Sequence, residues 1–227
     1  QFVKMFGKGR EEELRDLLQG EFAALALTDI SDDGLFVEVK AEYAKEMVTG
    51  FIQLDGVTVG AVANRTAIYD ENGEKAEEFA AVLTTDGAYK AAEFVTFCNA
   101  FEIPVLSLTN VKGFEANVRA EKTIAKAAAK LVYAFSNADV PKVNVITGEA
   151  YGSAYVAMNS KSVGADMVYA WSQASIGMMD ASLAAKIMYA DEIAAADDVT
   201  AKINEKASVT FSPSTSCEIA NVRYDFC

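Results

Sequence analysis

The sequence predicts an α/β fold in which helices cover a mainly parallel sheet, because short apolar runs alternate with segments of helical spacing from Ala88 onward. Before that point, Asp55-Gly56 separates two apolar runs at 51–54 and 57–63, and this dipeptide is a strong β-hairpin signal. The hairpin adds antiparallel strands to the parallel ones. Two strands followed by a helix, repeated along the chain, give a β-β-α layout.

The first helix of this alternation is predicted to follow Thr85 or Asp86, either of which can cap its N-terminus. Its apolar face has residues at i, i+3, i+4 and i+7, namely Phe94, Phe97, Cys98 and Phe101. We expect Cys98 in the core, since a free cysteine packs like a small hydrophobic residue. The helix ends before Pro104, and a buried strand follows at 104–110.

The rest of the chain continues the alternation, after an earlier turn predicted at 70–73. The later elements are a loop at 111–117, an alanine-rich helix at 120–138, strands at 143–146 and 166–171, and helices at 181–189 and 191–206. On the alanine-rich helix, Lys122, Lys126 and Lys130 lie four residues apart. They form either a solvated face or a patch for an anionic partner or ligand.

The composition narrows the possible functions. The 227 residues suffice for one large or two small domains, and a formal net charge of −13 disfavours nucleic acid and anionic membrane surfaces as partners. No apolar run approaches the roughly 20 residues needed to cross a bilayer, and residues 1–18 lack the features of a signal peptide. Cys98, Cys217 and Cys227 show no disulfide or metal-ligand spacing, so we expect a cytoplasmic protein without a metal site.

The chain contains no histidine, which excludes Ser-His-Asp and Cys-His catalytic groups and histidine-ligated zinc. This bears on "AYGSAY" at 150–155, where Ser153 lies on a predicted strand-to-helix turn. An esterase elbow has the pattern G-x-S-x-G, but Tyr151 and Tyr155 occupy its two glycine positions. With no histidine to activate the hydroxyl, Ser153 is not expected to be a nucleophile.

The backbone of the same turn offers another chemistry. The first N–H groups of a helix have no partner within the helix, so they can stabilise an oxyanion, and small residues at Gly152, Ser153 and Ala154 let a ligand approach them. Small residues equally suit close packing of a helix on a sheet, and the pattern leaves both interpretations open. Glu149 and Asp180, near turns, are either general bases or surface charges.

Four long stretches carry a resemblance to a known family. They occur in the order "MVTGFIQLDGVTVGAVANR", "AAEFVTFCNAFEIPVLSLTNVKGF", "AAAKLVYAFSNADVPKVNVITGEAYGSAYVAMNSK" and "GADMVYAWSQASIGMMD". Together they resemble the C-terminal half of the carboxyltransferase subunit of biotin-dependent acyl-CoA carboxylases and decarboxylases, including propionyl-CoA carboxylase β and glutaconyl-CoA and methylmalonyl-CoA decarboxylase α subunits. The resemblance covers 25–205. It implies a biotin-side carboxyltransferase domain at 25–206, between an N-terminal helix or linker at 1–24 and an irregular tail at 207–227.

The resemblance implies a crotonase/ClpP-like β-β-α superhelix, in agreement with the layout of the predicted strands and helices. It implies that the N–H groups of Ser153 and Ala154 stabilise the ureido oxyanion of biotin while CO₂ moves between carboxybiotin and an acyl-CoA. Val156 is implied to bear on the choice of acyl group. The implied biotin contacts are Gly152, Ser153, Ala154, Tyr155, Gly113 and Phe114.

The sequence departs from the family pattern at several points. Ser153 replaces the second glycine of the usual G-G-A-Y turn, which is harmless if only its N–H acts. The family loop D-V-P-G-F is replaced by "NVKGF" at 110–114, so Lys112 stands where the family has proline. The segment at 124–130 lacks the Arg-His of I-R-H-G-A-K, and Asp180 replaces the glycine of Met-Gly-Ala. These departures affect the loops that are implied to contact biotin and CoA.

The resemblance also implies partners. They are an N-terminal carboxyltransferase half, a biotin carboxyl carrier protein that bears the biotin, a biotin carboxylase or a membrane decarboxylase subunit, and further copies of the chain in a homo-oligomer. Two alternatives remain open. The chain could be a hydratase or lyase of the same fold that uses Glu149 or Asp180 as acid and base, or a non-catalytic module that assembles a biotin-dependent complex.

Overall fold

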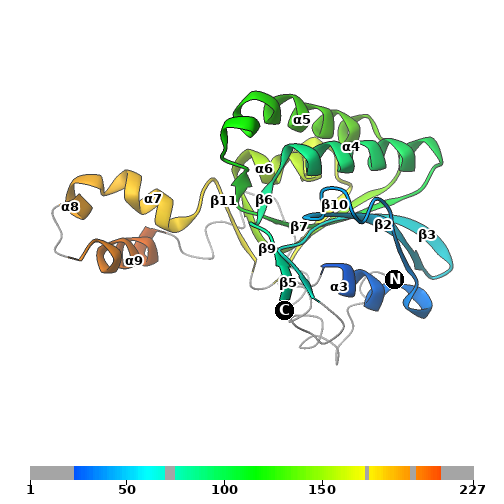
Figure 1. Cartoon of the computed structure of the whole chain (residues 1–227), viewed down its shortest axis with the longest axis horizontal. Helices are drawn as coiled ribbons and strands as arrows, with labels where there is room; N and C mark the ends of the chain where they lie inside the picture. Colours follow the sequence, from blue (N-terminus) through cyan, green and yellow to red (C-terminus); the bar gives the residue numbers. More distant parts are fainter. Residues whose placement is uncertain (1–22, 70–74, 172–173, 195–197, 211–227) are drawn as a thin grey trace.

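The computed structural model describes residues 23–69, 75–171, 174–194 and 198–210 (Figure 1). Within these residues the centre is a seven-stranded sheet. Its strands, in spatial order, are β1 (Phe36–Glu38), β2 (Met47–Leu54), β3 (Val57–Asn64), β7 (Val105–Val111), β9 (Lys142–Tyr151) and β10 (Met167–Ala170), with β11 (Ser175–Gly177) also on β9. β1, β2 and β3 pair antiparallel, whereas β3, β7, β9 and β10 run parallel. The predicted α/β class is therefore confirmed.

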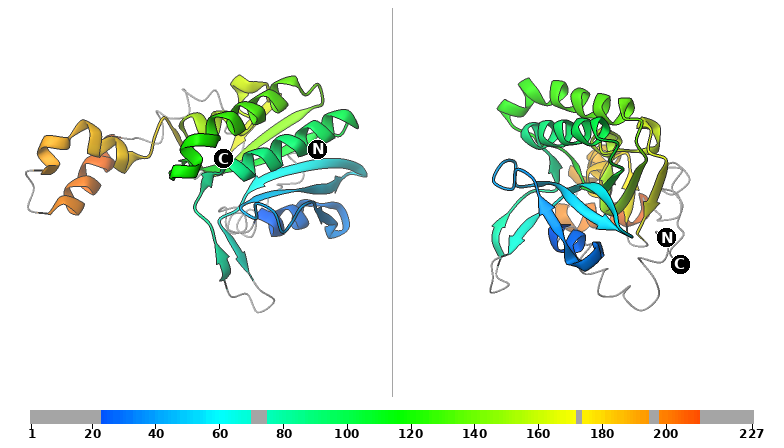
Figure 2. Two further views of the ribbon diagram at one scale, coloured as in Figure 1. Left: turned by 45° about the horizontal axis from the view of Figure 1, so that its top comes forward. Right: turned by 90° about the vertical axis from the view of Figure 1, so that its right-hand side faces the viewer.

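The predicted hairpin at Asp55-Gly56 is also confirmed. Asp55 has φ 53° and Gly56 has φ 78°, so both residues are left-handed, as a two-residue type I′ turn requires. The second predicted turn, at 70–73, lies outside the described residues. It falls between β4 (Ala67–Tyr69) and β5 (Lys75–Glu78), which pair antiparallel and project from the body as a separate ribbon (Figure 2).

Helices cover both faces of the sheet (Figures 1 and 2). One face carries α4 (Thr85–Ala100), α5 (Val118–Asn137) and the short α6 (Gly152–Ala157), and the other carries α3 (Ala23–Ile30). The cap of α4 is Thr84 and neither predicted candidate, Thr85 or Asp86, and its hydroxyl accepts the Gly87 N–H at 2.9 Å. The remaining short elements are η1 (Asp32–Gly34), η2 (Lys161–Val163) and the parallel pair β6 (Val82–Leu83) and β8 (Gly113–Phe114).

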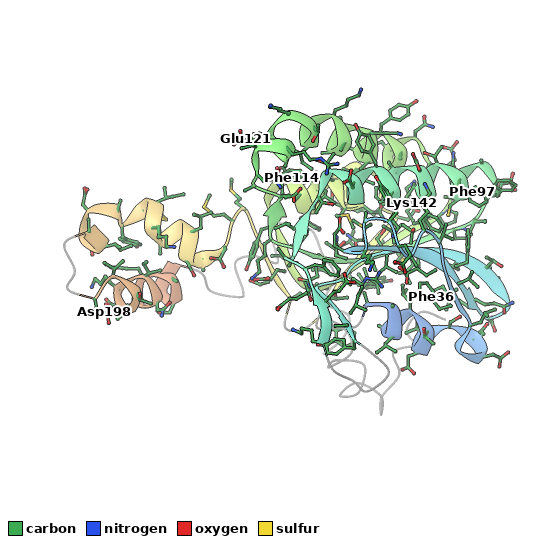
Figure 3. The ribbon with its side chains drawn as sticks, viewed as in Figure 1. Phe36, Phe97, Phe114, Glu121, Lys142 and Asp198 are labelled. Carbon is green, nitrogen blue, oxygen red and sulfur yellow. The ribbon has the colours of Figure 1, made fainter. Side chains whose placement is uncertain are left out.

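The predicted apolar face of α4 is half wrong. Cys98 is fully buried, as expected, and Phe94 is 6% exposed, but Phe97 is 45% and Phe101 64% exposed. Figure 3 shows Phe97 on the outer side of α4. Most of the buried face consists of small residues, Ala88, Ala91, Ala92 and Val95 with Cys98, beside Phe94 and Lys90. Small side chains let α4 lie close to the sheet, so the larger aromatic rings are displaced to its rim, where Phe97 stacks on Phe101 at 4.5 Å.

A helical arm lies apart from the sheet (Figure 1). It comprises α7 (Ala181–Met188), α8 (Ala190–Ala194) and α9 (Val199–Thr210), so the helix predicted at 191–206 is two helices. α9 extends into the range 207–227 that was predicted to be irregular, and residues 1–22 and 211–227 lie outside the described residues. None of the helices among the described residues is long and apolar enough to span a bilayer.

Candidate functional site

Strand β9 brings the candidate turn to one edge of the sheet. β3, β7 and β9 are parallel, so their C-terminal ends meet at this edge, where ligands of open α/β sheets usually bind. β9 continues beyond the predicted range 143–146 to Tyr151, and α6 starts at once with Gly152. Gly152 has φ +59°, and a Cβ at this position would lie 2.9 Å from the Met178 carbonyl oxygen. Both the backbone angle and the close contact therefore require glycine here.

A bulge in β9 precedes the turn. The pairing with β7 shifts register between Thr109 and Val111, because Val111 pairs with Ala150 although Thr109 pairs with Ile146. The buried Asn110 fills this irregularity, and its Oδ1 accepts the backbone N–H of Glu149 at 2.9 Å. Asn110 thus satisfies a backbone donor that the bulge leaves without a ladder partner.

The turn itself exposes backbone donors. Within the described residues, the N–H groups of Ser153 and Ala154 donate to no acceptor outside α6, and the preceding Tyr151 supplies no side-chain cap. The side chain of Ala154 is buried, whereas Ser153 is exposed. The Ser153 hydroxyl also has no hydrogen-bond partner among the described residues, so no base is placed to activate it. The arrangement suits stabilisation of a developing negative charge by two amides.

The structure brings the predicted residues Gly113 and Phe114 next to this turn. They form β8, which pairs with β6 and contacts α6. Phe114, near the start of α5 (Figure 3), is half-buried and packs against the core cluster that contains Ala154 and Tyr155. Gly113 has no atom within 4 Å of the position that a Cβ would occupy, so its backbone borders open space.

The remaining predicted positions differ in exposure. Tyr155 is only 8% exposed, and burial raises the pKa of its phenol to about 12, so it packs as a neutral side chain. Val156 is 38% exposed and is available at the surface of α6. Tyr151 is buried, its hydroxyl donates to Ser175 Oγ at 2.7 Å, and burial is the main cause that raises its pKa.

A buried polar network anchors the other end of α6, and the sequence pattern did not indicate it. The amide of Asn144 donates to the Met158 carbonyl at 3.1 Å, and its Oδ1 accepts from the Thr109 hydroxyl at 2.8 Å. Asn159 donates to Ser107 Oγ at 3.1 Å. The only signal in the sequence is polar residues within strands that otherwise read as apolar, since a fully buried asparagine needs partners.

The two carboxylates considered as general bases have other partners. Glu149 Oε2 lies 3.1 Å from Lys112 Nζ. Asp180 caps α7, because its Oδ1 accepts the backbone N–H groups of Ser182 and Leu183 at 2.9 and 3.3 Å. Asp180 thus satisfies two backbone donors at the start of α7 as its helix cap. Neither residue therefore has the arrangement of a free general base.

A cavity of about 630 Å³ lies beside β6 and the start of α5. Its polar lining includes Glu46, Asp86, Glu115, Asn117 and Arg119, and Arg119 Nη2 contacts both oxygens of Asp86 at 3.1 and 2.9 Å. Neither Ser153 nor Ala154 lines this cavity. The cavity flanks the β6–β8 pair and not the amides of the turn, which follow the C-terminal end of β9.

Known proteins resemble this chain over most of its length. Residues 23–219 match the carboxyl transferase domain family. The methylmalonyl-CoA carboxyltransferase 12S subunit of Propionibacterium freudenreichii subsp. shermanii is 40% identical over 200 residues, which are 86% of this chain and 36% of the relative. The propionyl-CoA carboxylase beta chain of Roseobacter denitrificans is 44% identical over 165 residues, 72% of this chain and 30% of the relative. Methylmalonyl-CoA decarboxylase subunit alpha of Propionigenium modestum is 39% identical over 181 residues, 79% of this chain and 33% of the relative.

Solved structures give the same result. A transcarboxylase 12S crystal structure with hydrolysed methylmalonyl-coenzyme A bound superposes with a TM-score of 0.78 at 38% identity, covering 92% of this chain and 40% of that chain. The beta subunit of P. aeruginosa geranyl-CoA carboxylase, 22% identical, shares the fold with a TM-score of 0.71 over 88% of this chain and 37% of its own. The predicted crotonase-type fold is confirmed, and the chain spans about a third of the length of the curated relatives. From its sequence and its fold, this chain belongs to the carboxyl transferase domain family.

Proposed function

We propose that the chain is the biotin-side half of an acyl-CoA carboxyltransferase, and that it acts together with an N-terminal carboxyltransferase half. The observation that carries this proposal is the pair of N–H groups at Ser153 and Ala154, which have no acceptor outside α6 among the described residues. They lie where β9 ends and β8 contacts α6. Two neighbouring backbone donors suit such a transfer, because negative charge develops on a single oxygen.

The residues present fit biotin. Its ureido group supplies the chemistry when bound, because the ring nitrogen carries CO₂ and the carbonyl oxygen takes up negative charge. Ser153 and Ala154 would donate their N–H groups to that oxygen, and Gly152 keeps the turn free of a side chain. Gly113 leaves backbone space on the neighbouring strand, and Phe114 offers an apolar wall. Since the donors belong to the backbone, their charge state does not change with pH.

The hydratase or lyase alternative has less support. It needs a free carboxylate as acid or base, but Glu149 is paired with Lys112 and Asp180 caps α7. The alternative predicts turnover of an enoyl-CoA by this chain alone, without biotin. The module alternative predicts binding of a biotinylated carrier without carboxyl transfer, even beside the N-terminal half. The first outcome is measured with this chain alone and an enoyl-CoA, and the second by binding of a biotinylated carrier beside the transfer assay below.

The proposal extends to partners. Because the chain spans about a third of its relatives, we place the acyl-CoA mainly on an N-terminal half and the biotin on a carrier protein. A biotin carboxylase or a membrane decarboxylase subunit would complete the cycle, and further copies of the chain would form the oligomer. Val156, at the surface of α6, is proposed to influence acyl choice. Carboxylation and decarboxylation share the same transfer step, so the proposed role of the turn is common to both.

The test is a transfer assay with this chain and its N-terminal half, methylmalonyl-CoA as donor and free biotin as acceptor. Ser153→Ala keeps the backbone N–H and should retain most of the activity. Ala154→Pro deletes one N–H in the first helical turn, where proline is tolerated, and should lower kcat by about 10²–10³-fold. Ala154→Gly is the matched control, because it changes the same side chain and keeps the donor.

The three variants separate the backbone from the hydroxyl. Thermal unfolding of each variant is compared with that of the parent chain, because Ala154 is buried; the loss in Ala154→Pro is assigned to the missing donor when its melting temperature matches that of Ala154→Gly. If Ser153→Ala and Ala154→Pro lose the same activity, the hydroxyl takes part and the backbone assignment is wrong. If the parent pair transfers no carboxyl group at all, the proposed function is wrong.

A further inference from the structure

We propose that Lys112 binds the carboxylate that is transferred at this site, and that Glu149 holds its ammonium until that carboxylate arrives. The inference rests on the proposed function, because it assigns a residue to the same reaction. Lys112 lies between β7 and β8 and carries a positive charge directly before the proposed biotin contacts Gly113 and Phe114. The ligand class is a malonyl-type acyl-CoA, in which a free carboxylate lies next to the thioester.

The position of Lys112 is fixed by the backbone on both sides of the ion pair. Lys112 lies between β7 and β8, and its N–H donates to the Ala81 carbonyl at 2.7 Å. Glu149 lies in the bulge of β9, and its N–H donates to Asn110 Oδ1 at 2.9 Å. Both side chains therefore start from hydrogen-bonded backbone at the C-terminal edge of the sheet. Lys112 directly precedes Gly113, and Glu149 lies three residues before Gly152.

The ion pair itself can be exchanged. Lys112 Nζ lies 3.1 Å from Glu149 Oε2, and the two side chains are 55% and 30% exposed. Solvent-exposed pairs of this kind contribute little to stability, so a second carboxylate can compete for the ammonium. The long flexible stem of lysine allows the charge to move without a change in the backbone.

The surrounding charges show why a cation is needed. The phenol of Tyr151, which directly precedes the turn, is influenced by the charges of Glu149, Asp180 and Lys112. Two of these three groups are carboxylates, so an entering carboxylate would meet a repulsive field without Lys112. Asp180 already accepts two backbone N–H groups of α7, so of these two carboxylates it is Glu149 that pairs with Lys112.

This placement predicts selectivity for the carboxylated substrate. Methylmalonyl-CoA carries the carboxylate, whereas propionyl-CoA differs by lacking it. A contact between Lys112 and the carboxylate therefore strengthens binding of the first compound and not of the second. Backbone amides at Ser153 and Ala154 bind a neutral carbonyl or its oxyanion, so they cannot provide the same discrimination.

The experiment uses this chain with its N-terminal half, methylmalonyl-CoA as substrate, free biotin as acceptor and propionyl-CoA as a competitive inhibitor. Lys112→Met should raise KM for methylmalonyl-CoA by about 10-fold or more and leave Ki for propionyl-CoA within about twofold. Lys112→Arg keeps the charge and should restore most of the affinity. Glu149→Gln releases the ammonium and should leave KM unchanged or lower it.

Three results would overturn the inference. An unchanged KM in Lys112→Met would mean that the ammonium does not contact the carboxylate. Equal damage in Lys112→Met and Glu149→Gln would mean that the pair serves only to hold the two strands. A parent pair that transfers no carboxyl group would remove the proposed function and this inference together, whereas active parent protein with an unaffected Lys112→Met variant removes the inference alone.

Discussion

Replacing Gly148 by alanine tests whether Asn110 holds the bulge that precedes the turn. A Cβ at Gly148 would lie 2.7 Å from Asn110 Oδ1 and 3.0 Å from Cγ, closer than van der Waals contact allows. Asn110 is 6% exposed and has little room to move. If it stays, the overpacked site costs about 1–3 kcal/mol. If it moves, the Glu149 N–H loses its acceptor, at a similar cost of about 1–3 kcal/mol.

The size of this effect can be measured as a coupling energy. Denaturant unfolding of the parent chain, Gly148→Ala, Asn110→Ala and the double variant forms a double-mutant cycle. Asn110→Ala removes the three atoms nearest to the new methyl group, so Gly148→Ala should be nearly neutral in that background. We expect Gly148→Ala alone to lower the melting temperature by about 2–12 °C. Additive effects in the double variant would show that the two residues do not compete for space, and would refute the role given to Asn110.

Three further predictions concern the turn, the arm and a buried lysine. Gly152→Ala should destabilise the chain by about 1–3 kcal/mol in denaturant unfolding, because φ is +59° and the new Cβ would meet the Met178 carbonyl; an unchanged stability would contradict this. Asp180→Ala should speed amide exchange in α7 alone through loss of its cap, whereas Asp180→Asn should preserve protection; exchange that rises equally in α4 would contradict a local role. Burial lowers the pKa of Lys90 to about 8 from 10.5, so between these pH values the unfolded chain binds more protons and stability should rise with pH; a Lys90→Met variant with the same slope would refute this.

The elements that the sequence predicted well are those set by local chemistry. Asp55-Gly56 specifies a type I′ turn from its own backbone preferences, and the alternation after Ala88 gives the parallel strands and their helices. The face of α4 was predicted less well, because a helical period fits an aromatic stripe and an alanine stripe equally. Packing against the sheet decides between them, and the close approach of Gly60 to Cys98 favours the small residues.

For the candidate site, the sequence predicted the turn at 152–154 but not the side-chain contacts that surround it. Small residues after an apolar run indicated where backbone amides could face a ligand, and the absence of histidine removed the serine alternative. The hydrogen bond from the Glu149 N–H to Asn110 depends on the register shift between β7 and β9, and no local sequence pattern predicts such a shift. The pairing of Lys112 with Glu149 likewise joins residues far apart in sequence, and only the meeting of the C-terminal ends of β7 and β9 brings them together.

The packing of Cys98 has a consequence for labelling chemistry. Its sulfur is fully buried, burial raises its pKa to about 12, and a Cβ at Gly60 would lie only 2.5 Å from it. At neutral pH about one molecule in 10⁵ carries the thiolate, and a reagent has no space to approach. Alkylating probes should therefore leave Cys98 unmodified while the chain is folded. The rate at which Cys98 is alkylated should therefore report the rate of global unfolding, because the thiol becomes accessible only when α4 separates from the sheet.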